Sequence, residues 1–175
     1  GSDHLICTPW MLGERCPVSS TTTRATLFNI SMVHTREHLM RAVYEGIGYN
    51  LRWILENYSR DYGFSCDDFR IIGGGALDDA WMQIIADITG KRFSVVKDPR
   101  NAGAVGAAIV ALIGLGELPG FGSAKDFVQV EKHYEPDPVN RKIYNDLFDD
   151  YKNVYYALEG AYIKANGDRF KGEEQ

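Results

Sequence analysis

The sequence predicts an α/β fold that is rich in helices and contains a small mixed sheet. Apolar residues recur at helical spacing in four stretches, which indicates that helices dominate. Short apolar runs at 69–72 and 92–96 stand between these stretches and are typical of buried strands. Three consecutive glycines at 73–75 join the first run to a helical stretch, which predicts a strand, a glycine turn and a helix in succession.

The beginning of the chain predicts little regular structure. Residues 1–2 resemble a vector-derived scar, and the absence of an initiator Met predicts that the chain is a piece of a longer protein. Proline, glycine and a Ser-Ser-Thr-Thr-Thr run indicate irregular backbone across 3–26, and a short strand is expected at 27–32. We therefore expect residues 3–34 to form a lead-in loop with one strand, and residues 35–165 to form the main domain.

A long helix is predicted to begin after Thr35 and to continue to about Tyr58. Thr35 is suited to the N-cap position, and Glu37 places a negative charge in the first turn. The helix contains Gly46 and Gly48, although glycine costs about 1 kcal/mol in a helix interior. We expect another element to approach the helix closely at these two positions.

The middle of the chain predicts further alternation of strands and helices. A helix follows the glycine turn, and a strand is expected at 92–96. A turn at 98–103 then leads to an alanine-rich helix at 104–115, which we expect to be tightly packed. A short edge strand is expected at 127–131.

The last helix is predicted to run from Asp137-Pro138 to about Ala165, since an N-cap residue followed by proline favours a helix start. Its apolar stripe is more typical of a core or an interface than of a cofactor site, and a homodimer face is one possibility. Residues 166–175 are expected to be a frayed tail. The stripe consists of Ile143, Leu147, Tyr151, Val154, Leu158 and Tyr162.

Composition excludes several classes of function. A net charge of −5 and a pI near 5.4 argue against a nucleic-acid partner, which requires clustered Lys and Arg. No apolar run approaches the roughly 18 residues of a membrane span. The three cysteines lack a CxxC spacing, which favours reduced thiols and a cytoplasmic protein.

The glycine turn has two interpretations. It is either a tight strand-to-helix connection or a cradle whose backbone N–H groups bind a phosphate at a helix N-terminus. A Rossmann fingerprint is disfavoured because Asp78 stands at the third glycine position. A Walker A loop is also disfavoured, because no Gly-Lys-Ser/Thr follows the glycines.

His34 and His38 formally match the H-x-x-E-H zinc pattern, with Glu37 as a base. Thr35 as N-cap would leave His34 outside the helix, so polar residues of a first helical turn are the preferred interpretation, and we predict no metal site.

Glu14 and Arg15 lie in a predicted loop between Gly13 and Pro17. They form either a solvated ion pair or part of a loop that lines a substrate or nucleotide cleft.

Several segments taken together resemble the C-terminal domain of the FGGY carbohydrate kinases, in particular the xylulokinase and gluconokinase branch. Their order and separation agree with the family across roughly residues 8–118. Two departures are Leu77-Asp78, where the family often has Arg-Ser, and Asn29, where it usually has glycine. Asparagine suits this position if the backbone needs a positive φ. The four matching segments are 12–17, 34–47, 73–83 with Ala86-Asp87, and 103–108.

The resemblance implies half of an actin-like, ribonuclease H-like ATPase fold, in which two domains close over ATP and a sugar. It implies backbone contacts from Gly73, Gly74, Gly75 and Ala76 to adenosine or its α-phosphate. The remaining positions that it implies are Leu77 and Asp79 near the base or ribose, and Gly103 and Gly106, which would pack a helix against the site.

The resemblance also implies what the parent protein does. It would phosphorylate a ketopentose such as xylulose with ATP and Mg²⁺, with gluconate or another sugar acid as the alternative substrate. The general base and most sugar contacts would lie in an N-terminal domain outside this chain, so the chain alone is expected to be inactive. A non-catalytic actin-like ATP switch and a dinucleotide-binding domain are the remaining alternatives, the latter disfavoured by the failed fingerprint.

Overall fold

The computed structural model describes residues 1–167 and confirms an α/β fold with a small mixed sheet. In this sheet β4 lies between β3, to which it is parallel, and β5, to which it is antiparallel. A separate antiparallel pair joins β1 and β2. In chain order the elements are β1 (Ile6–Thr8), β2 (Thr26–Phe28), α1 (Arg36–Tyr62), β3 (Asp68–Ile71), a 3₁₀ turn (Gly74–Leu77), α2 (Asp79–Thr89), β4 (Arg92–Val96), α3 (Ala102–Gly114), a second 3₁₀ turn (Phe121–Ser123), α4 (Ala124–Phe127), β5 (Val130–Tyr134) and α5 (Pro138–Asn166).

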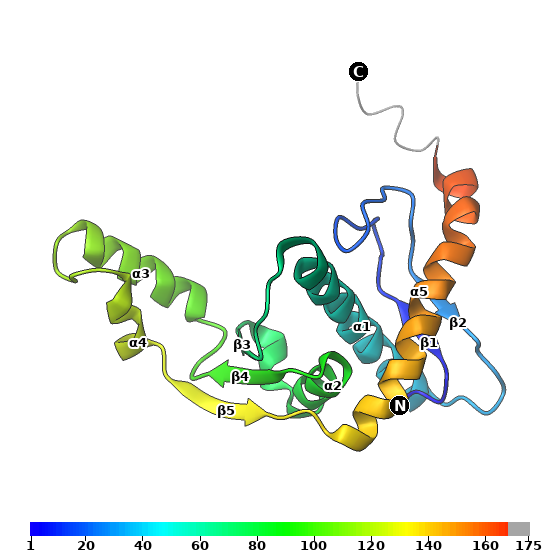
Figure 1. Ribbon diagram of the computed structural model, residues 1–175, viewed down its shortest axis with the longest axis horizontal. Coiled ribbons are helices and arrows are strands. Elements are labelled where there is room, and N and C mark those ends of the chain that lie inside the picture. Colours follow the sequence, from blue (N-terminus) through cyan, green and yellow to red (C-terminus); the bar gives the residue numbers. More distant parts are fainter. Residues whose placement is uncertain (168–175) are drawn as a thin grey trace.

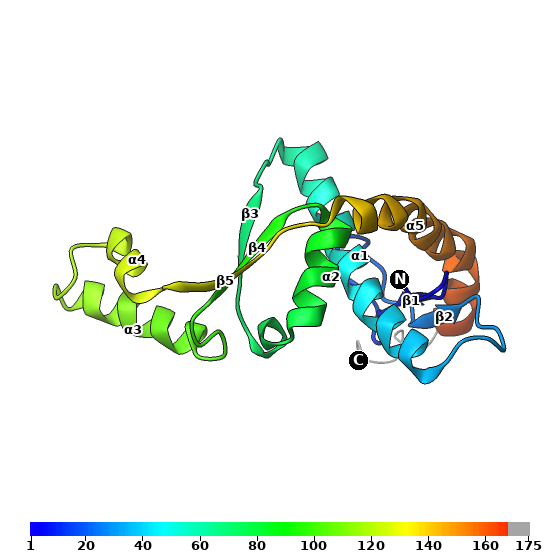
Figure 2. The same cartoon turned by 90° about the horizontal axis from the view of Figure 1, so that it is seen from below.

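The molecule consists of a packed body and a projecting arm (Figure 1). The body contains α1, α2, α5 and the β1–β2 pair, and its aromatic core joins α1 to α5. Strands β4 and β5 lead away from the body to α3 and α4, which lie at the far end in both views (Figure 2). A second core lies between α2 and the sheet.

The N-terminal segment contains a packed strand, β1, that was not expected, whereas residues 9–25 contain no helix or strand. Strand β1 is buried along its whole length, and Trp10 just beyond it belongs to the main core. Ser2 is 1% exposed and donates from both its backbone N and its Oγ to Glu45. A strand of three residues that is buried on both faces shows no alternation, so the sequence pattern could not reveal it.

Helix α1 confirms the predicted N-cap and the predicted close approaches. Thr35 is the N-cap, and the helix continues to Tyr62, beyond the expected end. A Cβ at Gly46 would overlap the carbonyl oxygen of Cys7, and one at Gly48 would lie 2.8 Å from Ile88 Cδ1. The two glycines therefore allow β1 and α2 to approach the backbone of α1.

Helix α3 contradicts the expectation of tight packing. Its single buried residue is Ile109, although the helix contains no charged side chain. A Cβ at Gly103 or Gly106 would meet no atom within 4 Å, so neither glycine packs the helix against another element of the described chain. An apolar helix with this exposure lacks its covering surface within residues 1–167.

Helix α5 begins where the sequence predicted. Asp137 Oδ1 accepts from the backbone N of Val139 at 2.7 Å and of Asn140 at 3.3 Å. Leu147, Tyr151 and Val154 of the predicted stripe enter the main core, which favours internal packing over a dimer face. The predicted tail falls mostly outside the described residues.

Two strand boundaries differ from expectation. Strand β2 covers 26–28 and not 27–32, and β5 covers 130–134, while 124–127 is helical. Asn29, just after β2, has φ 69°. Asparagine enters this region of φ more readily than most residues, which accounts for Asn29 at a position where the family usually has glycine.

Candidate functional site

The glycine turn lies at the carboxyl ends of the two parallel strands of the sheet. Gly73 follows β3 with φ 97°, and its N–H donates to the carbonyl of Pro99, in the loop after β4, at 2.8 Å. A Cβ at Gly73 would meet nothing within 4 Å, and the nearest atom to one at Gly74 would be Arg100 Nε at 4.0 Å. The turn therefore presents open backbone at the edge of an α/β sheet where ligands commonly bind.

The rest of the turn is braced by an aromatic pair. A Cβ at Gly75 would overlap the ring of Trp81, and this ring stacks on Tyr44 with centroids 5.2 Å apart. Trp81 also donates from Nε1 to the carbonyl of Tyr44 at 3.3 Å. Ala76 is buried in the core between α2 and the sheet. Gly75 thus serves packing, whereas Gly73 and Gly74 face open space.

Asp78, which stands at the third glycine position of the dinucleotide fingerprint, has a structural role in this fold. Asp78 is the N-cap of α2, and its Oδ1 accepts from the backbone N of Trp81 at 3.0 Å. Its Oδ2 accepts from the hydroxyl of Tyr44 at 2.9 Å. The carboxylate thereby starts the helix and ties it to α1.

Leu77 and Asp79, the two other predicted nucleotide contacts, differ in whether the side chain already has a partner within the chain. Leu77 is 49% exposed and offers an apolar surface beside the turn. The carboxylate of Asp79 is engaged, since Oδ1 accepts from Lys132 Nζ at 2.7 Å and from the Tyr134 hydroxyl at 2.6 Å. The hydrogen bond from Lys132, followed by that from Tyr134, lowers the pKa of Asp79. A base or ribose contact from this side chain would compete with both partners.

The loop that contains Glu14 is held by side chain to backbone hydrogen bonds. Glu14 Oε1 accepts from the backbone N of Arg15 at 2.8 Å and of Cys16 at 3.3 Å. Its Oε2 accepts from Asn50 Nδ2 at 3.4 Å, while Asn50 Oδ1 accepts from Trp10 Nε1 at 3.0 Å. Glu14 and Arg15 therefore do not form an ion pair, which was one of the two interpretations of this loop. Asn50 also lines a groove with Gly75.

The histidines lie as a first-turn interpretation requires. His34 precedes the helix, and its Nδ1 accepts from the backbone N of Ser31 at 3.0 Å. His38 Nδ1 accepts from the backbone N of Thr35 at 3.0 Å. Within residues 1–167, no group of three His, Cys, Asp or Glu side chains could hold a metal ion.

A Ser–His–Asp cluster occurs on adjacent strands, but in an order unsuited to nucleophilic catalysis. Ser94 Oγ donates to Asp68 Oδ1 at 2.6 Å and lies 2.9 Å from His133 Nδ1. The serine is thus bound between the other two and is 1% exposed. A catalytic triad instead places the histidine between an accessible serine and the carboxylate.

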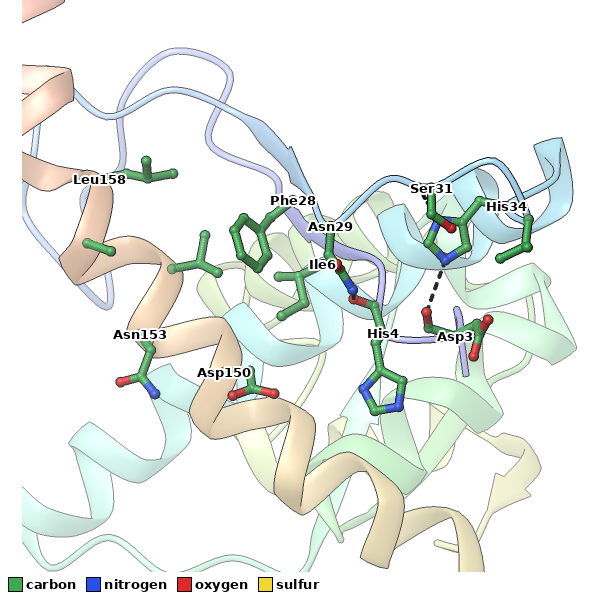
Figure 3. Close-up of a pocket in the computed structure, with 13 residues that line it drawn as sticks. Asp3, His4, Ile6, Phe28, Asn29, Ser31, His34, Asp150, Asn153 and Leu158 are labelled. Atoms are coloured by element: carbon green, nitrogen blue, oxygen red, sulfur yellow. Dashed lines mark hydrogen bonds between the residues drawn. The ribbon is translucent and has the colours of Figure 1, made fainter.

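A further cavity lies away from the glycine turn. It has a volume of about 730 Å³ and lies between the β1–β2 pair and α5 (Figure 3). His34 Nε2 is 3.0 Å from the carbonyl of Asp3 at its rim, and Phe28 and Leu158 supply apolar walls. None of the predicted site residues lines this cavity.

No helix in the described part of the chain is long and apolar enough to cross a membrane. Cys7, Cys16 and Cys66 are unpaired, as expected from their spacing, and burial raises the pKa of the Cys7 thiol.

Sequence reasoning missed the partners that hold the site. Tyr44, Lys132 and Tyr134 lie 34 to 55 residues from the aspartates that they bind, and no local pattern marks such pairs. Asn50 had one usable signal, since it is a polar residue on the otherwise apolar stripe of α1.

The fold and the open glycine turn define the class of protein. It is an α/β domain in which a strand, a glycine turn and a helix form a connection of the kind that binds ligands. Residues 2–115 match the C-terminal domain model of the FGGY family of carbohydrate kinases. The chain therefore belongs to this family of ATP-dependent carbohydrate kinases, and its fold is that of the family's actin-like ATPase C-terminal domain.

Individual relatives include two kinds of sugar kinase. The chain is 36% identical over 157 residues to a xylulose kinase of Bacillus subtilis (strain 168), and this alignment covers 89% of the chain and 31% of the relative. The chain is 29% identical over 164 residues to a gluconokinase of Bacillus licheniformis, and this alignment covers 94% of the chain and 32% of the relative. The chain thus spans about a third of the length of these curated relatives.

Solved structures agree with this assignment. A ligand-bound xylulose kinase from Lactobacillus acidophilus superposes with a TM-score of 0.84 at 28% identity, over 94% of this chain and 33% of that one. A Plasmodium falciparum glycerol kinase with ADP shares the fold, with a TM-score of 0.74 at 23% identity, over 90% of this chain and 31% of that one.

Proposed function

We propose that this chain is the nucleotide-binding part of a kinase that transfers a phosphoryl group from ATP to a ketopentose, with xylulose as the first candidate. The observation that carries the proposal is the open backbone of Gly73 and Gly74 at the carboxyl ends of β3 and β4, in a domain of the FGGY family. The relative with the highest identity quoted above is a xylulose kinase.

The residues of the turn fit an adenosine and its α-phosphate. The backbone of Gly73 and Gly74 is free of neighbouring side chains, so a phosphate or ribose can approach it closely. Leu77 would contact the base, and Asp79 would contact the base or ribose in exchange for Lys132. Arg15 would approach the nucleotide from the loop after Trp10, because Glu14 in that loop is hydrogen-bonded to Asn50, which also lines the groove beside Gly75.

The remaining parts of the reaction would come from outside the chain. Phosphoryl transfer depends on positioning and on Mg²⁺, which neutralises the phosphates. We assign no Mg²⁺ ligand or general base to residues 1–167, and we propose that an N-terminal domain supplies the base and most sugar contacts. The isolated chain would then bind nucleotide without turnover, and the two domains would close over the substrates.

Gluconate is the alternative substrate, favoured by the gluconokinase that aligns over 94% of the chain. A non-catalytic ATP switch is the alternative function. Recovery of the parent reading frame allows a direct assay with xylulose and gluconate. Preference for gluconate would correct the substrate, and ATP binding without phosphorylation of any sugar would favour the switch.

The nucleotide itself is tested on the isolated chain by titration calorimetry with ATP, ADP and NAD⁺. Binding of ATP and ADP without NAD⁺ is expected. Binding of NAD⁺ alone would overturn the proposal, as would sugar-dependent ADP formation by this chain without its partner domain.

A further inference from the structure

A small pocket lies at the end of α2 that is opposite the glycine turn. It has a volume of about 190 Å³ and is lined by residues of α1, of the end of α2, of the start of α5 and of the loop before β3. The glycine turn precedes α2, whereas Thr89 of the pocket is the last residue of this helix. The 11 residues of α2 span roughly 16 Å at 1.5 Å each, so the pocket is separate from the glycine turn.

The pocket is rich in cations, although the whole chain carries a net charge of −5. Arg52, Lys91 and Arg141 line it, and Glu56 is the single carboxylate among the lining residues. Arg52 Nε donates to Glu56 Oε1 at 3.0 Å. Lys91 Nζ donates to Asp67 Oδ1 at 2.6 Å. Within residues 1–167, Arg141 forms no ion pair, so its charge has no carboxylate partner.

The guanidinium of Arg141 is held in place by the end of α2. Gly90 follows this helix with φ 66°, and a Cβ there would lie 2.8 Å from Arg141 Cζ, so the glycine leaves room for the guanidinium. Arg141 Nη1 donates to the carbonyl of Ile88, which also accepts from Arg52 Nη1 at 3.4 Å. Two guanidinium groups therefore meet at one carbonyl oxygen. Burial, followed by the positive charge of Arg52, lowers the pKa of Arg141.

Helix capping accounts for only part of this arrangement. Cations interact favourably with the last carbonyls of a helix, which explains one N–H group of each arginine. A guanidinium has five N–H donors, and Arg141 uses one of them in the described part of the chain. Charged side chains that are withdrawn from water are normally paired. An anion in the pocket would supply the missing acceptor, and the planar fork of an arginine matches a phosphate.

We propose that this pocket binds a phosphate group, which Arg141 and Arg52 would hold with Lys91 beside them. The volume is below the roughly 300–1,000 Å³ of pockets for drug-sized ligands, which favours inorganic phosphate or the phosphate of a small monoester. Ser59 and Ser65 also line the pocket, and their hydroxyl groups form no hydrogen bond with residues 1–167, so each can donate to the anion. The inference goes beyond the proposed function and does not depend on it.

Titration calorimetry of the isolated chain with inorganic phosphate tests the proposal, with the ionic strength kept constant by chloride. Saturable binding is expected. Arg141→Met removes the charge and should weaken this binding by at least about tenfold. Lys142→Met is the matched control, because it removes the same charge from the next residue of α5, which does not line the pocket. This control should bind phosphate like the original chain, and thermal unfolding verifies that both variants are folded.

NMR of the arginine side chains gives a second readout on the original chain, which decides if Arg141→Met does not fold. Phosphate should shift the Nε–H signals of Arg141 and Arg52. Methyl phosphate then distinguishes the two sources of the group. Binding of methyl phosphate with similar affinity would identify a monoester as the class of ligand, and binding of inorganic phosphate alone would identify the free ion.

Three outcomes would overturn the inference. The first is that neither inorganic phosphate nor methyl phosphate binds, and the second is that a folded Arg141→Met binds them like the original chain. The third is phosphate binding that Gly74→Leu abolishes without any shift of the Arg141 signal, which would place the anion on the glycine turn. ATP affinity should be unchanged in Arg141→Met, so failure of this proposal and failure of the proposed function are distinguishable.

Discussion

The carbonyl oxygen of Cys7 lies directly against Gly46, so closely that a Cβ on this glycine would overlap it. This contact seats β1 on α1 and brings the N-terminal segment into the core. A glycine in the interior of a helix, unfavourable by itself, is thereby explained by the strand that lies across it.

Gly46→Ala is expected to destabilise the chain by about 3 kcal/mol, because either the strand or the helix must shift. Gly160→Ala is the matched control, since Gly160 lies within α5 and a Cβ there meets nothing within 4 Å. The control should be stabilised by about 0.5–1 kcal/mol. Urea unfolding measures both, and equal stability of the two variants would contradict the contact.

The carboxylate of Asp87 joins α2 to the start of α5. It is 1% exposed and accepts from Gln83 Nε2 at 2.8 Å, from Asp137 N at 2.8 Å and from Asn140 Nδ2 at 2.9 Å. Asp87→Asn places a donor against these donors, so we expect a loss of about 2–4 kcal/mol by thermal or urea unfolding. Asp149→Asn, which removes an exposed partner of Lys152, should cost less than about 0.5 kcal/mol.

Asp79 should titrate below its ordinary pKa of about 3.9. Lys132 and Tyr134 hydrogen-bond to the carboxylate and lower its pKa in the folded chain. A lowered folded pKa means that the contribution to stability is present above about pH 4 and is lost as the pH falls through the folded value. Carboxyl NMR measures this pKa directly. Lys132→Met should raise it toward the ordinary value, and no change in this variant would exclude the ion pair as the cause.

Gly74 separates the ligand role of the glycine turn from its structural role. A Cβ there has its nearest neighbour at 4.0 Å, so Gly74→Leu should fold with nearly unchanged stability. If adenosine lies on this backbone, the same variant should lose at least about tenfold in ATP affinity by calorimetry, through steric overlap. Leu77→Ala is the matched comparison. It removes only one apolar contact, so it should lose less ATP affinity than Gly74→Leu. Unchanged ATP binding by Gly74→Leu would place the nucleotide elsewhere.

Glu14 should control the order of its loop. Glu14→Ala removes the acceptor for the amides of Arg15 and Cys16, and faster exchange of both amides is expected with a stability loss of about 1 kcal/mol. Arg15→Ala leaves these hydrogen bonds intact and should exchange like the original chain. Unaltered amide exchange in the glutamate variant would show that the loop is held by other contacts.

The sequence by itself determined those features whose causes lie within a few residues. The caps at Thr35 and Asp137, the strand at 92–96, the glycine turn and the periodic face of α2 depend on local backbone geometry, and each was predicted close to its observed position. The segments that resemble the FGGY family could also be recognised from the sequence, because each of them is contiguous in the chain.

The tertiary structure alone decided which distant groups meet. It placed β1 in the core, gave the carboxylate of Glu14 to backbone amides and that of Asp79 to Lys132, and left α3 and one edge of β3 uncovered. These outcomes depend on contacts between residues that are far apart in the chain, or on surfaces outside it. Hydrophobic periodicity identifies an apolar face but does not specify what covers it.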